Sequence, residues 1–350
     1  MGKTRIAVAG AGLIGRAHVA ALRDSESCCL HAVVDPSPSA IKIAADAGVP
    51  YFASLDALLA HSRPDGVILA TPNALHVPQA LQCVAAGLPT LVEKPIAPTV
   101  AEAQRLVDAV QACKGRVLVG HHRAHSLIMA CAAQVIQAGQ LGRLVTVAGS
   151  ATFYKPDNYF ADGPWRSQTG GGPILINMIH EVHNLRMLCG EITAVQAFAS
   201  NAVRGFVVED TVAINLRFAS GVLGTFMLSD TAAGARSWEQ TSRENKDFPS
   251  YEDEDCYVIS GTQGTLSVPT MRLKTYAQNE ERSWWKPLMR SVVSIKNAVR
   301  ADPIALQMEH FGAVVRGEVA PLVTVQDGLA NLRVTEAISR AAECGQIVQL

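Results

Sequence analysis

Lys94, in the tripeptide Glu93-Lys94-Pro95, could exchange a proton with an oxygen atom of a bound molecule. A lysine ammonium can polarise a carbonyl oxygen and give it a proton, or its amine can take the proton that a hydroxyl group loses. A lysine with this task needs its pKa lowered by burial or by a neighbouring cation. The alternative is a solvated lysine that pairs with Glu93.

His180 is the second residue that could bind a hydroxyl group or handle a proton. It lies in an apolar helical stretch, residues 174–188. Asn177, Glu181 and Asn184 share a helix face with it at i, i+3, i+4 spacing. Because burying such polar groups unpaired costs about 1–3 kcal/mol each, we expect this stripe to line a polar cavity. The alternative is a core histidine that bonds a backbone carbonyl.

A third feature could bind an anion. The apolar run 5–9 leads into Gly10-Ala11-Gly12-Leu13-Ile14-Gly15 and then into an alanine-rich helical stretch. In this pattern the first glycine permits a tight turn, the second lets the backbone approach a pyrophosphate, and the third lets the helix pack close to the strand. Free N–H groups at the helix N-terminus attract the anion. We predict a dinucleotide site; the alternative is a tight strand-to-helix turn without a ligand.

Asp35 indicates which dinucleotide would bind. It ends a second apolar run, residues 30–34, and lies 20 residues after Gly15, where an acid should contact the adenosine ribose hydroxyls. A carboxylate repels a 2′-phosphate, so the sequence favours NAD. Ser37 and Ser39 could still admit NADP.

The elements that must position these residues alternate between strand and helix in the first third of the chain. Strands are predicted at 5–9, 29–34, 67–70, 89–92 and 116–119, and helices at 13–23, 38–47, 55–60, 76–86 and 99–113. Such alternation gives a parallel sheet with ligands at the carboxyl ends of its strands. Polar residues follow three of the strands, in segments 70–76, 91–95 and 119–123.

The pattern changes after residue 122 to longer strand-like runs between 143 and 276. We therefore predict an α/β fold with a dinucleotide-binding Rossmann domain at 1–122. An α+β domain with an open, mostly antiparallel sheet should follow at 123–350. The polar stretch from Ala232 to Glu254 is expected to be a mobile surface loop, or alternatively a structured insertion that lines the site.

The amino-acid composition of the chain limits the kinds of partner that it could bind. The formal net charge is −1 and no long basic run is present, which argues against nucleic acid or an anionic membrane surface. No apolar stretch reaches the roughly 20 residues of a membrane helix, and we expect no signal peptide in the first residues. We expect a cytoplasmic protein. No Cys and His spacing suggests a metal site.

Several motifs together resemble the glucose–fructose oxidoreductase/inositol dehydrogenase (Gfo/Idh/MocA) family. They are Glu93-Lys94-Pro95 after a Rossmann strand, Thr71-Pro72-Asn73 with His76, Gly170-Gly171-Gly172 with a histidine eight residues later, and the tail 309–328. The resemblance implies NAD(P)-dependent hydride transfer, a Rossmann domain followed by an open-sheet domain, and homodimers or homotetramers formed through that sheet.

The resemblance also implies residue roles. Lys94 would be the catalytic lysine, often preceding a cis bond to the proline. His180 would bind substrate hydroxyls and take part in proton transfer. The family's usual aspartate, four residues before this histidine, is Ile176 here. Asn177 is not a simple replacement, because one residue turns a helix by about 100°. The proton path would use Lys94 and His180 alone, or water.

A rim of aromatic and cationic residues should flank the reactive end of the cofactor, namely Arg123, Tyr154, Lys155, Trp165 and Arg166. Such groups suit a substrate that carries carboxylates. We therefore hypothesise a uronate-like sugar or a cyclic dihydrodiol carboxylate. The alternative is that the arginines pair with protein carboxylates or with the cofactor pyrophosphate.

The predicted site residues form two sets. Those expected to bind the cofactor are Gly10, Gly12, Leu13, Ile14, Gly15, Asp35, Thr71, Pro72, Asn73, His76, Glu93, Lys94, Arg123, Trp165 and Arg166. Those expected to bind the substrate are Lys94, His122, Arg123, Tyr154, Arg166, Asn177 and His180.

Three functions are compatible with these residues. The first is an NAD(P)-dependent dehydrogenase that acts on a secondary alcohol of a sugar, polyol, uronate or cyclic dihydrodiol. The second is a glycosidase-like enzyme in which bound NAD oxidises the substrate transiently. The third is a non-catalytic nucleotide sensor, against which Lys94 argues because a sensor has no need of it.

Overall fold

The computed structural model describes residues 2–277, 280–295 and 301–350, and the chain forms two compact units. The first contains Met1–His125 and Asp302–Leu332, and the second contains Ser126–Ala301 and Arg333–Leu350. This division differs from the expected boundary after residue 122, because residues 302–332 pack with the N-terminal part of the chain.

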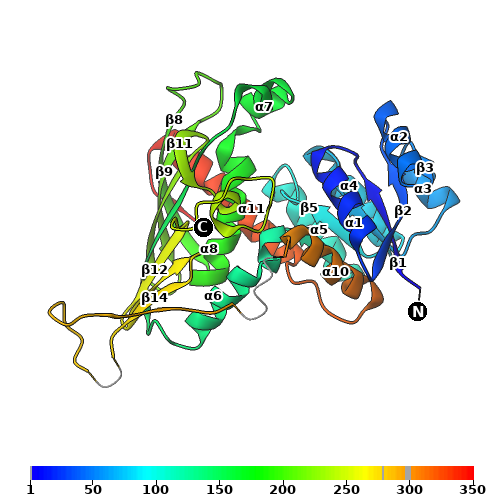
Figure 1. Ribbon diagram of the computed structural model, residues 1–350. Coiled ribbons are helices and arrows are strands. Elements are labelled where there is room, and N and C mark those ends of the chain that lie inside the picture. Colours follow the sequence, from blue (N-terminus) through cyan, green and yellow to red (C-terminus); the bar gives the residue numbers. More distant parts are fainter. Residues whose placement is uncertain (1, 278–279, 296–300) are drawn as a thin grey trace. The chain divides into compact units, whose positions relative to one another are not determined.

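The first unit is a parallel sheet flanked by helices (Figure 1). Its strand order is β3-β2-β1-β4-β5-β6, and all neighbouring strands are parallel. The strands are β1 Thr4–Ala9, β2 Cys28–Val34, β3 Tyr51–Phe52, β4 Gly66–Leu69, β5 Thr90–Glu93 and β6 Val117–Gly120. The helices are α1 Leu13–Asp24, α2 Pro38–Asp46, α3 Leu55–His61, α4 Asn73–Ala85, α5 Val100–Cys113, the short 3₁₀ helix η1 His122–His125 and α10 Pro303–Arg316.

The position of α10 explains the difference in the boundary. Gly66, which begins β4, lies so close to α10 that an added Cβ would be 2.7 Å from Val315 Cγ2. Met308 and Phe311 of α10 are fully buried, and α10 contacts α1 and η1. The apolar face of α10 thus covers part of the sheet, as parallel strands that are apolar on both faces require.

The second unit is an open sheet in the order β15-β14-β13-β12-β7-β10-β9-β8-β16, with β11 paired to β7. Only β7 and β10 pair in parallel among the described strands of this sheet. The strands are β7 Leu144–Tyr154, β8 Ile192–Ser200, β9 Thr211–Phe218, β10 Leu223–Ser229, β11 Thr231–Arg236, β12 Tyr257–Gly261, β13 Gly264–Val268, β14 Arg272–Thr275, β15 Met289–Val292 and β16 Val348–Gln349.

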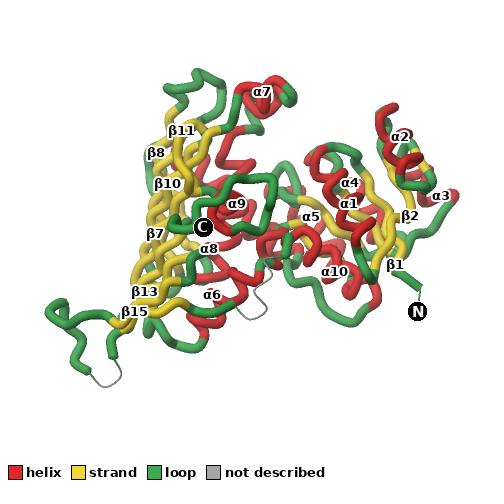
Figure 2. The backbone as a smooth tube through the Cα atoms, viewed as in Figure 1, coloured by secondary structure: helices red, strands yellow, loops and turns green. Residues whose placement is uncertain are grey.

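Helices cover one side of this sheet and leave the other side open (Figure 2). The helical segments that follow His125 in the chain, apart from α10, are α6 Leu127–Gln137, α7 Asp157–Ala161, η2 Pro164–Ser167, η3 Ile174–Met178, α8 Ile179–Cys189, α9 Trp238–Ser242 and α11 Val325–Cys344. The covered side carries the core, in which Tyr257, Phe218 and Phe226 are buried. The fold class therefore agrees with the prediction.

The stretch 232–254 is not the featureless loop that its polarity suggested. It contains β11 and α9, and Trp238 is 3% exposed. Trp238 Nε1 donates to Glu244 Oε2 at 2.9 Å, and Ser126 Oγ donates to Glu244 Oε1 at 2.6 Å. The expectation of a mobile surface loop was wrong, because Glu244 bonds both Trp238 within the stretch and Ser126, which lies 118 residues away in the sequence.

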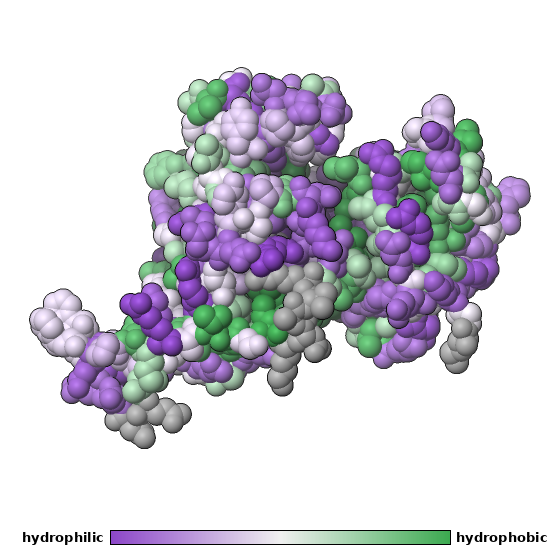
Figure 3. Space-filling view, viewed as in Figure 1, coloured by the Kyte–Doolittle hydropathy of each residue, from purple (hydrophilic) through white to green (hydrophobic). Residues whose placement is uncertain are grey.

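The surface seen in Figure 3 is largely polar, with smaller groups of apolar side chains among the polar ones. Within the described ranges, no helix combines the length and apolarity that crossing a bilayer requires.

Candidate functional site

The glycine loop joins β1 to α1 in the first unit. Gly10 has φ +94°, and an added Cβ would overlap the Ala70 carbonyl at the end of β4. A Cβ on Gly15 would overlap the carbonyl oxygen of Gly10. By contrast, nothing lies within 4 Å of the Cβ position of Gly12, the N-cap of α1. Gly10 and Gly15 thus pack the loop tightly, whereas Gly12 leaves open space beside the free N–H groups at the start of α1.

Leu13 and Ile14 form the first turn of α1 beside this open space. Leu13 is 72% exposed, although it is a large apolar residue, and Ile14 is half-buried. An exposed apolar side chain in the first turn of the helix is accessible for the cofactor contact predicted for it.

Asp35 lies at the carboxyl end of β2 and faces the glycine loop. Its Oδ2 accepts from Ala11 N at 2.7 Å, and its Oδ1 accepts from Ser37 N at 2.7 Å. Burial raises the pKa of Asp35, but hydrogen bonds from Ser37 and Ala11 outweigh this effect, and the pKa is lowered. The residue is therefore a charged carboxylate beside the loop, as ribose binding would require.

The loop after β4 is linked to the loop after β5. The half-buried Thr71 donates through Oγ1 to Gln79 at 2.7 Å, and Pro72 is the N-cap of α4, which begins at Asn73. His76 is 1% exposed, with its ring nitrogens 2.7 Å from Pro95 O and 2.8 Å from Thr71 O. Burial lowers the pKa of His76. Its imidazole therefore links these two loops, and the cofactor contact of His76 stays a prediction.

Lys94 follows β5 directly and is half-buried, and its peptide bond to Pro95 is cis. Glu93 holds the backbone here, since its Oε2 accepts from Lys94 N at 3.2 Å. Its Oε1 lies 2.8 Å from Nε2 of His18, a fully buried residue of α1. Lys94 is thus attached, through Glu93 and His18, to the helix that the glycine loop opens.

The buried Glu93 carboxylate remains charged. Burial raises the pKa of Glu93, but the hydrogen bond from His18 and the nearby His18, His122 and Lys94 charges outweigh it, so the pKa is lowered. The carboxylate also lies against Gly120, where an added Cβ would be 2.8 Å from Glu93 Oε1.

Two predicted residues of this unit lie in η1. His122 is half-buried and contributes to the electrostatics of Glu93. Arg123 is only 4% exposed, and its contact with cofactor or substrate stays a prediction. It is followed by His125, which is also buried and whose ring lies 5.0 Å from that of His310 in α10. The short helix η1 thus packs against α10.

These features fit a bound dinucleotide. Open space lies at the helix N-terminus above Gly12, a charged Asp35 ends β2, and polar loops follow β4 and β5. Gly12, Leu13 and Asp35 are the residues that would hold the pyrophosphate and the adenosine ribose.

In the second unit, the predicted helix of residues 174–188 begins as a π-helix. Residues Ile174–Met178 form this π-turn, and α8 continues from Ile179 to Cys189. A π-turn contains more residues than an α-turn and so changes which residues share a face. The single polar stripe predicted from 3.6-residue spacing was therefore wrong.

The stripe divides into two groups. Glu181 and Asn184 contact Tyr257 of the core, because Tyr257 OH donates to Glu181 Oε2 and Asn184 Nδ2 donates to Tyr257 OH at 2.9 Å. Asn177 instead accepts from Lys155. His180 is 7% exposed and lies in the first turn of α8.

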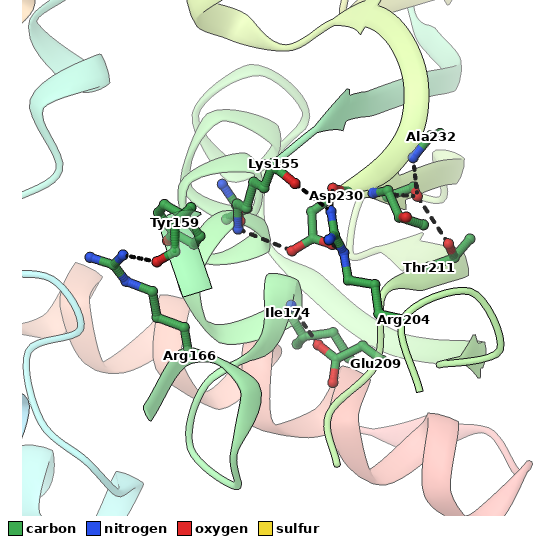
Figure 4. A network of polar contacts seen from close by, with 12 residues as sticks. Lys155, Tyr159, Arg166, Ile174, Arg204, Glu209, Thr211, Asp230 and Ala232 are labelled. Carbon is green, nitrogen blue, oxygen red and sulfur yellow. Dashed lines mark hydrogen bonds and ion pairs between the residues drawn. The ribbon is translucent and has the colours of Figure 1, made fainter. Parts of the chain in front are cut away.

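Lys155, just after β7, is the centre of a buried polar network (Figure 4). Its Nζ donates to Asn177 Oδ1 at 2.7 Å and lies 3.2 Å from Asp230 Oδ2. Arg204 Nε donates to Asp230 Oδ1 at 3.1 Å, and the Asp230 side chain is 3% exposed. Burial lowers the pKa of Lys155, while Asp230 opposes the shift. The buried Asp230 carboxylate therefore pairs with both cations, and the exposed Asp157 lies 3.9 Å from Arg204 Nη1.

Arg166 lies beside this network and stacks on Tyr159. Its guanidinium carbon is 4.0 Å from the Tyr159 ring centroid, and Nη1 donates to Tyr159 O. Lys155 Nζ is 4.9 Å from the same centroid. Across the described ranges, Arg166 has no carboxylate partner. The alternative in which it pairs with a protein acid is therefore not what the fold shows.

Tyr154 and Trp165, two further residues of the predicted rim, are exposed. They are 57% and 53% exposed, and Tyr154 lies 5.1 Å from the guanidinium of Arg204. Aromatic and cationic groups thus gather at the ends of β7 and β10.

The three-glycine segment 170–172 anchors the helix that carries Asn177 and His180. Glu209 Oε1 accepts from Ile174 N at 2.8 Å, and an added Cβ on Gly172, at φ +80°, would lie 2.7 Å from that oxygen. Burial raises the pKa of Glu209. Glycine is needed here because the carboxylate that caps the helix lies against the loop.

Sequence reasoning missed several residues of these two networks. His18 could have been found, because it shares the buried face of α1 with Gly15 and Leu22 at helical spacing. Arg204, Glu209 and Asp230 carried no such signal, since they come from a loop and a strand end far from Lys155 in the sequence.

Residues 4–121 match the family model described as an oxidoreductase family with an NAD-binding Rossmann fold. Residues 129–267 match the GFO/IDH/MocA C-terminal domain.

Known proteins resemble the chain over most of its length. It is 28% identical to the rhizopine catabolism protein MocA of Rhizobium meliloti, covering 96% of this chain and 94% of that protein. It is 26% identical to the 1,5-anhydro-D-fructose reductase of Ensifer adhaerens, covering 85% and 83%. The WlbA dehydrogenase of Chromobacterium violaceum, solved with NADH and UDP-GlcNAcA, superimposes with a TM-score of 0.80 at 25% identity, covering 99% and 96%.

Proposed function

The chain belongs to the Gfo/Idh/MocA family of NAD(P)-dependent sugar and polyol oxidoreductases, and from this premise we propose that it oxidises a secondary alcohol of a carboxylated sugar or cyclic diol. Its fold binds NAD, and its relatives are dehydrogenases and reductases that act on alcohol groups. When bound, NAD supplies the hydride acceptor. The protein must bind and orient the alcohol and receive its hydroxyl proton.

Lys94 is the residue that we propose for the proton. The observation that carries this role is its place at the end of β5, tied through Glu93 and His18 to the helix that begins at the glycine loop. Its ammonium can hydrogen-bond the substrate oxygen, and the neutral amine can accept the hydroxyl proton. His180, on α8, is proposed to bind a substrate hydroxyl.

Arg166 supports the choice of an acidic substrate. Its guanidinium carries a charge that no acid of the described chain balances, and Lys155 adds a second cation across Tyr159. Guanidinium groups bind carboxylates through paired N–H donors. The related WlbA dehydrogenase was solved with a uronate-bearing nucleotide sugar, UDP-GlcNAcA. We therefore propose that Tyr154, Arg166, Asn177 and His180 contact the substrate.

NADH formation tests this proposal. Purified protein is incubated with NAD or NADP and with matched pairs of neutral sugars or polyols and their acids. We expect net NADH formation, faster with the acids, and a loss of about 10²–10⁴-fold in kcat for Lys94→Ala with nucleotide binding retained. Arg166→Ala should remove the preference for the acids. Net NADH also distinguishes a dehydrogenase from an enzyme that reoxidises its own cofactor within each turnover.

We further propose that two copies meet through the open side of the sheet. Phe198 on β8, Leu223 and Met227 on β10 and Val258 on β12 are 68%, 58%, 44% and 39% exposed. Phe198 and Met227 both pair with Ala213 of β9, so they share one row across the sheet. A broad exposed apolar face of this kind is typical of an interface. Light scattering should show a dimer or tetramer that Met227→Lys with Leu223→Lys dissociates.

A further inference from the structure

The side-chain amide of Asn177 is held in one orientation, so that its NH₂ group is available as a hydrogen-bond donor. Its Oδ1 accepts from Lys155 Nζ at 2.7 Å. An ammonium group only donates hydrogen bonds, so the amide oxygen must face Lys155 and the NH₂ group must face away from it. Asn177 is half-buried, and throughout the described chain no side chain or backbone group bonds its Nδ2. The amide therefore offers two N–H groups to a ligand and no acceptor.

Lys155 cannot readily move away from this position. It is 9% exposed, and Asp230 holds its ammonium at 3.2 Å. Its backbone N donates to Asp230 O at 2.9 Å, and its backbone O accepts from Arg204 Nη2 at 2.7 Å. The rings of Phe153 and Tyr159 lie 5.7 and 4.9 Å from Nζ. The ammonium therefore has one stable orientation, and so does the amide that it bonds.

We propose that Lys155 determines substrate specificity through Asn177, by holding the amide so that its N–H groups donate to a carboxylate oxygen of the substrate. This rests on the proposed function of the site. An ionised carboxylate accepts hydrogen bonds and cannot donate them, so it matches a group that only donates. Asp230 pairs with Lys155 and Arg204, and Asp157 lies 3.9 Å from Arg204, whereas Arg166 has no carboxylate partner in the described chain. The positive charge of Arg166 favours an anion over a neutral hydroxyl.

Binding of matched ligands measures this preference without requiring turnover. D-glucuronate and D-galacturonate are compared with D-glucose and D-galactose by calorimetry on the NADH-saturated protein. We expect at least one acid to bind about tenfold more tightly than its neutral partner, which is the effect of one hydrogen bond to a charged group. If no acid binds more tightly than its neutral partner, the proposal is overturned. Binding of an acid without NADH formation from NAD would instead contradict the proposed function.

Variants then separate the role of Lys155 from a general structural effect. Asn177→Ala and Lys155→Met should each reduce the acid-to-neutral ratio about tenfold, and the double variant should reduce it no further, because both remove the same donor. Lys155→Met leaves Arg204 paired with Asp230, and the exposed Lys274→Met is the matched control. Asn177→Asp replaces the donor by a carboxylate while Lys155 is retained, and it should make the neutral ligands bind more tightly than the acids. Independent, multiplicative losses in the double variant would show that Lys155 contacts the substrate directly and would overturn the proposal.

Discussion

The two units position their polar groups by different physical means. In the first unit the predicted nucleotide site is made largely by backbone, in which Gly10 and Gly15 allow close packing and Gly12 leaves the helix N-terminus open. In the second unit the site is made by side-chain charges, with Lys155 and Arg204 around Asp230. A backbone site depends on space and conformation. A charged network depends on the balance of its ions, and its loss should affect stability before it affects nucleotide binding.

The largest expected effect is on the charged network. Asp230→Asn leaves Lys155 and Arg204 buried without their carboxylate, and breaking a buried pair in this way costs about 3–5 kcal/mol. We expect the free energy of unfolding, measured by urea denaturation, to fall by this amount. NAD affinity of the folded protein should change little, because the glycine loop and Asp35, which are expected to hold the pyrophosphate and the ribose, lie in the other unit.

The control for Asp230→Asn is Asp247→Asn, on the exposed surface of the same unit. Equal stability of the two variants would show that the network is solvated and that the contrast between the units is wrong.

The corresponding experiment in the first unit exchanges two glycines. Gly10→Ala requires a positive φ and an overlap with Ala70, whereas Gly12→Ala meets no atom within 4 Å. Backbone strain alone should cost Gly10→Ala about 1–3 kcal/mol of stability. Gly12→Ala should fold normally yet bind NAD more weakly, because the new methyl group occupies the open space.

Circular dichroism melts and NAD titrations give both quantities for each glycine variant. If Gly12→Ala binds NAD as tightly as the unmodified protein, the pyrophosphate does not lie over this residue.

The same contrast determines how much could be predicted from the sequence. Gly10 to Gly15, Asp35 and Glu93-Lys94-Pro95 lie in short segments at strand ends, and parallel strands bring such ends to one edge of the sheet. The class of each unit and most strands followed from apolar patterning in the same way. These features are local, so sequence spacing was sufficient.

The network of the second unit could not be predicted. Lys155 meets Asp230 only because β7 and β10 pair in parallel, with Thr152 opposite Ser229. Asn177 bonds Lys155 from within a π-turn, which the regular spacing of residues 174–188 did not indicate. The place of α10 in the first unit likewise depends on long-range packing against Gly66. Contacts of this kind become visible only in the folded chain.

Asp35 offers a smaller and more specific test of the first unit. Its carboxylate accepts from Ala11 N and Ser37 N, and its lowered pKa keeps it ionised at neutral pH. Asp35→Ala should weaken NAD binding by about 10–100-fold, as expected for the loss of hydrogen bonds to a charged group. NADP binding should weaken less, because the repulsion of its 2′-phosphate is also removed. Fluorescence titration with both nucleotides, with Asp56→Ala as control, would show whether Asp35 selects the cofactor; equal losses for NAD and NADP would exclude that role.

The smallest expected effect concerns Glu209 in the second unit. Its pKa is raised by burial above the ordinary value of 4.5, so the folded state binds a proton more tightly than the unfolded state does. The resulting stability is present below pH 4.5 and is lost as pH rises through the folded-state pKa. Glu209→Gln keeps an oxygen that can accept from Ile174 N, and the variant carries no charge to bury. Relative to the unmodified protein, it should therefore gain stability as pH rises from 4.5 to 7, by less than about 1 kcal/mol.

Urea denaturation at several pH values measures the difference in stability between the two proteins. Lys155 and Asp230, the charged residues that act on Glu209, are the same in both. A Gln variant that becomes relatively less stable with rising pH would mean that the cations of the network stabilise the Glu209 carboxylate more than burial penalises it. In that case Glu209 belongs to the ion balance around Lys155, and the excess of positive charge available to a substrate carboxylate is smaller by one.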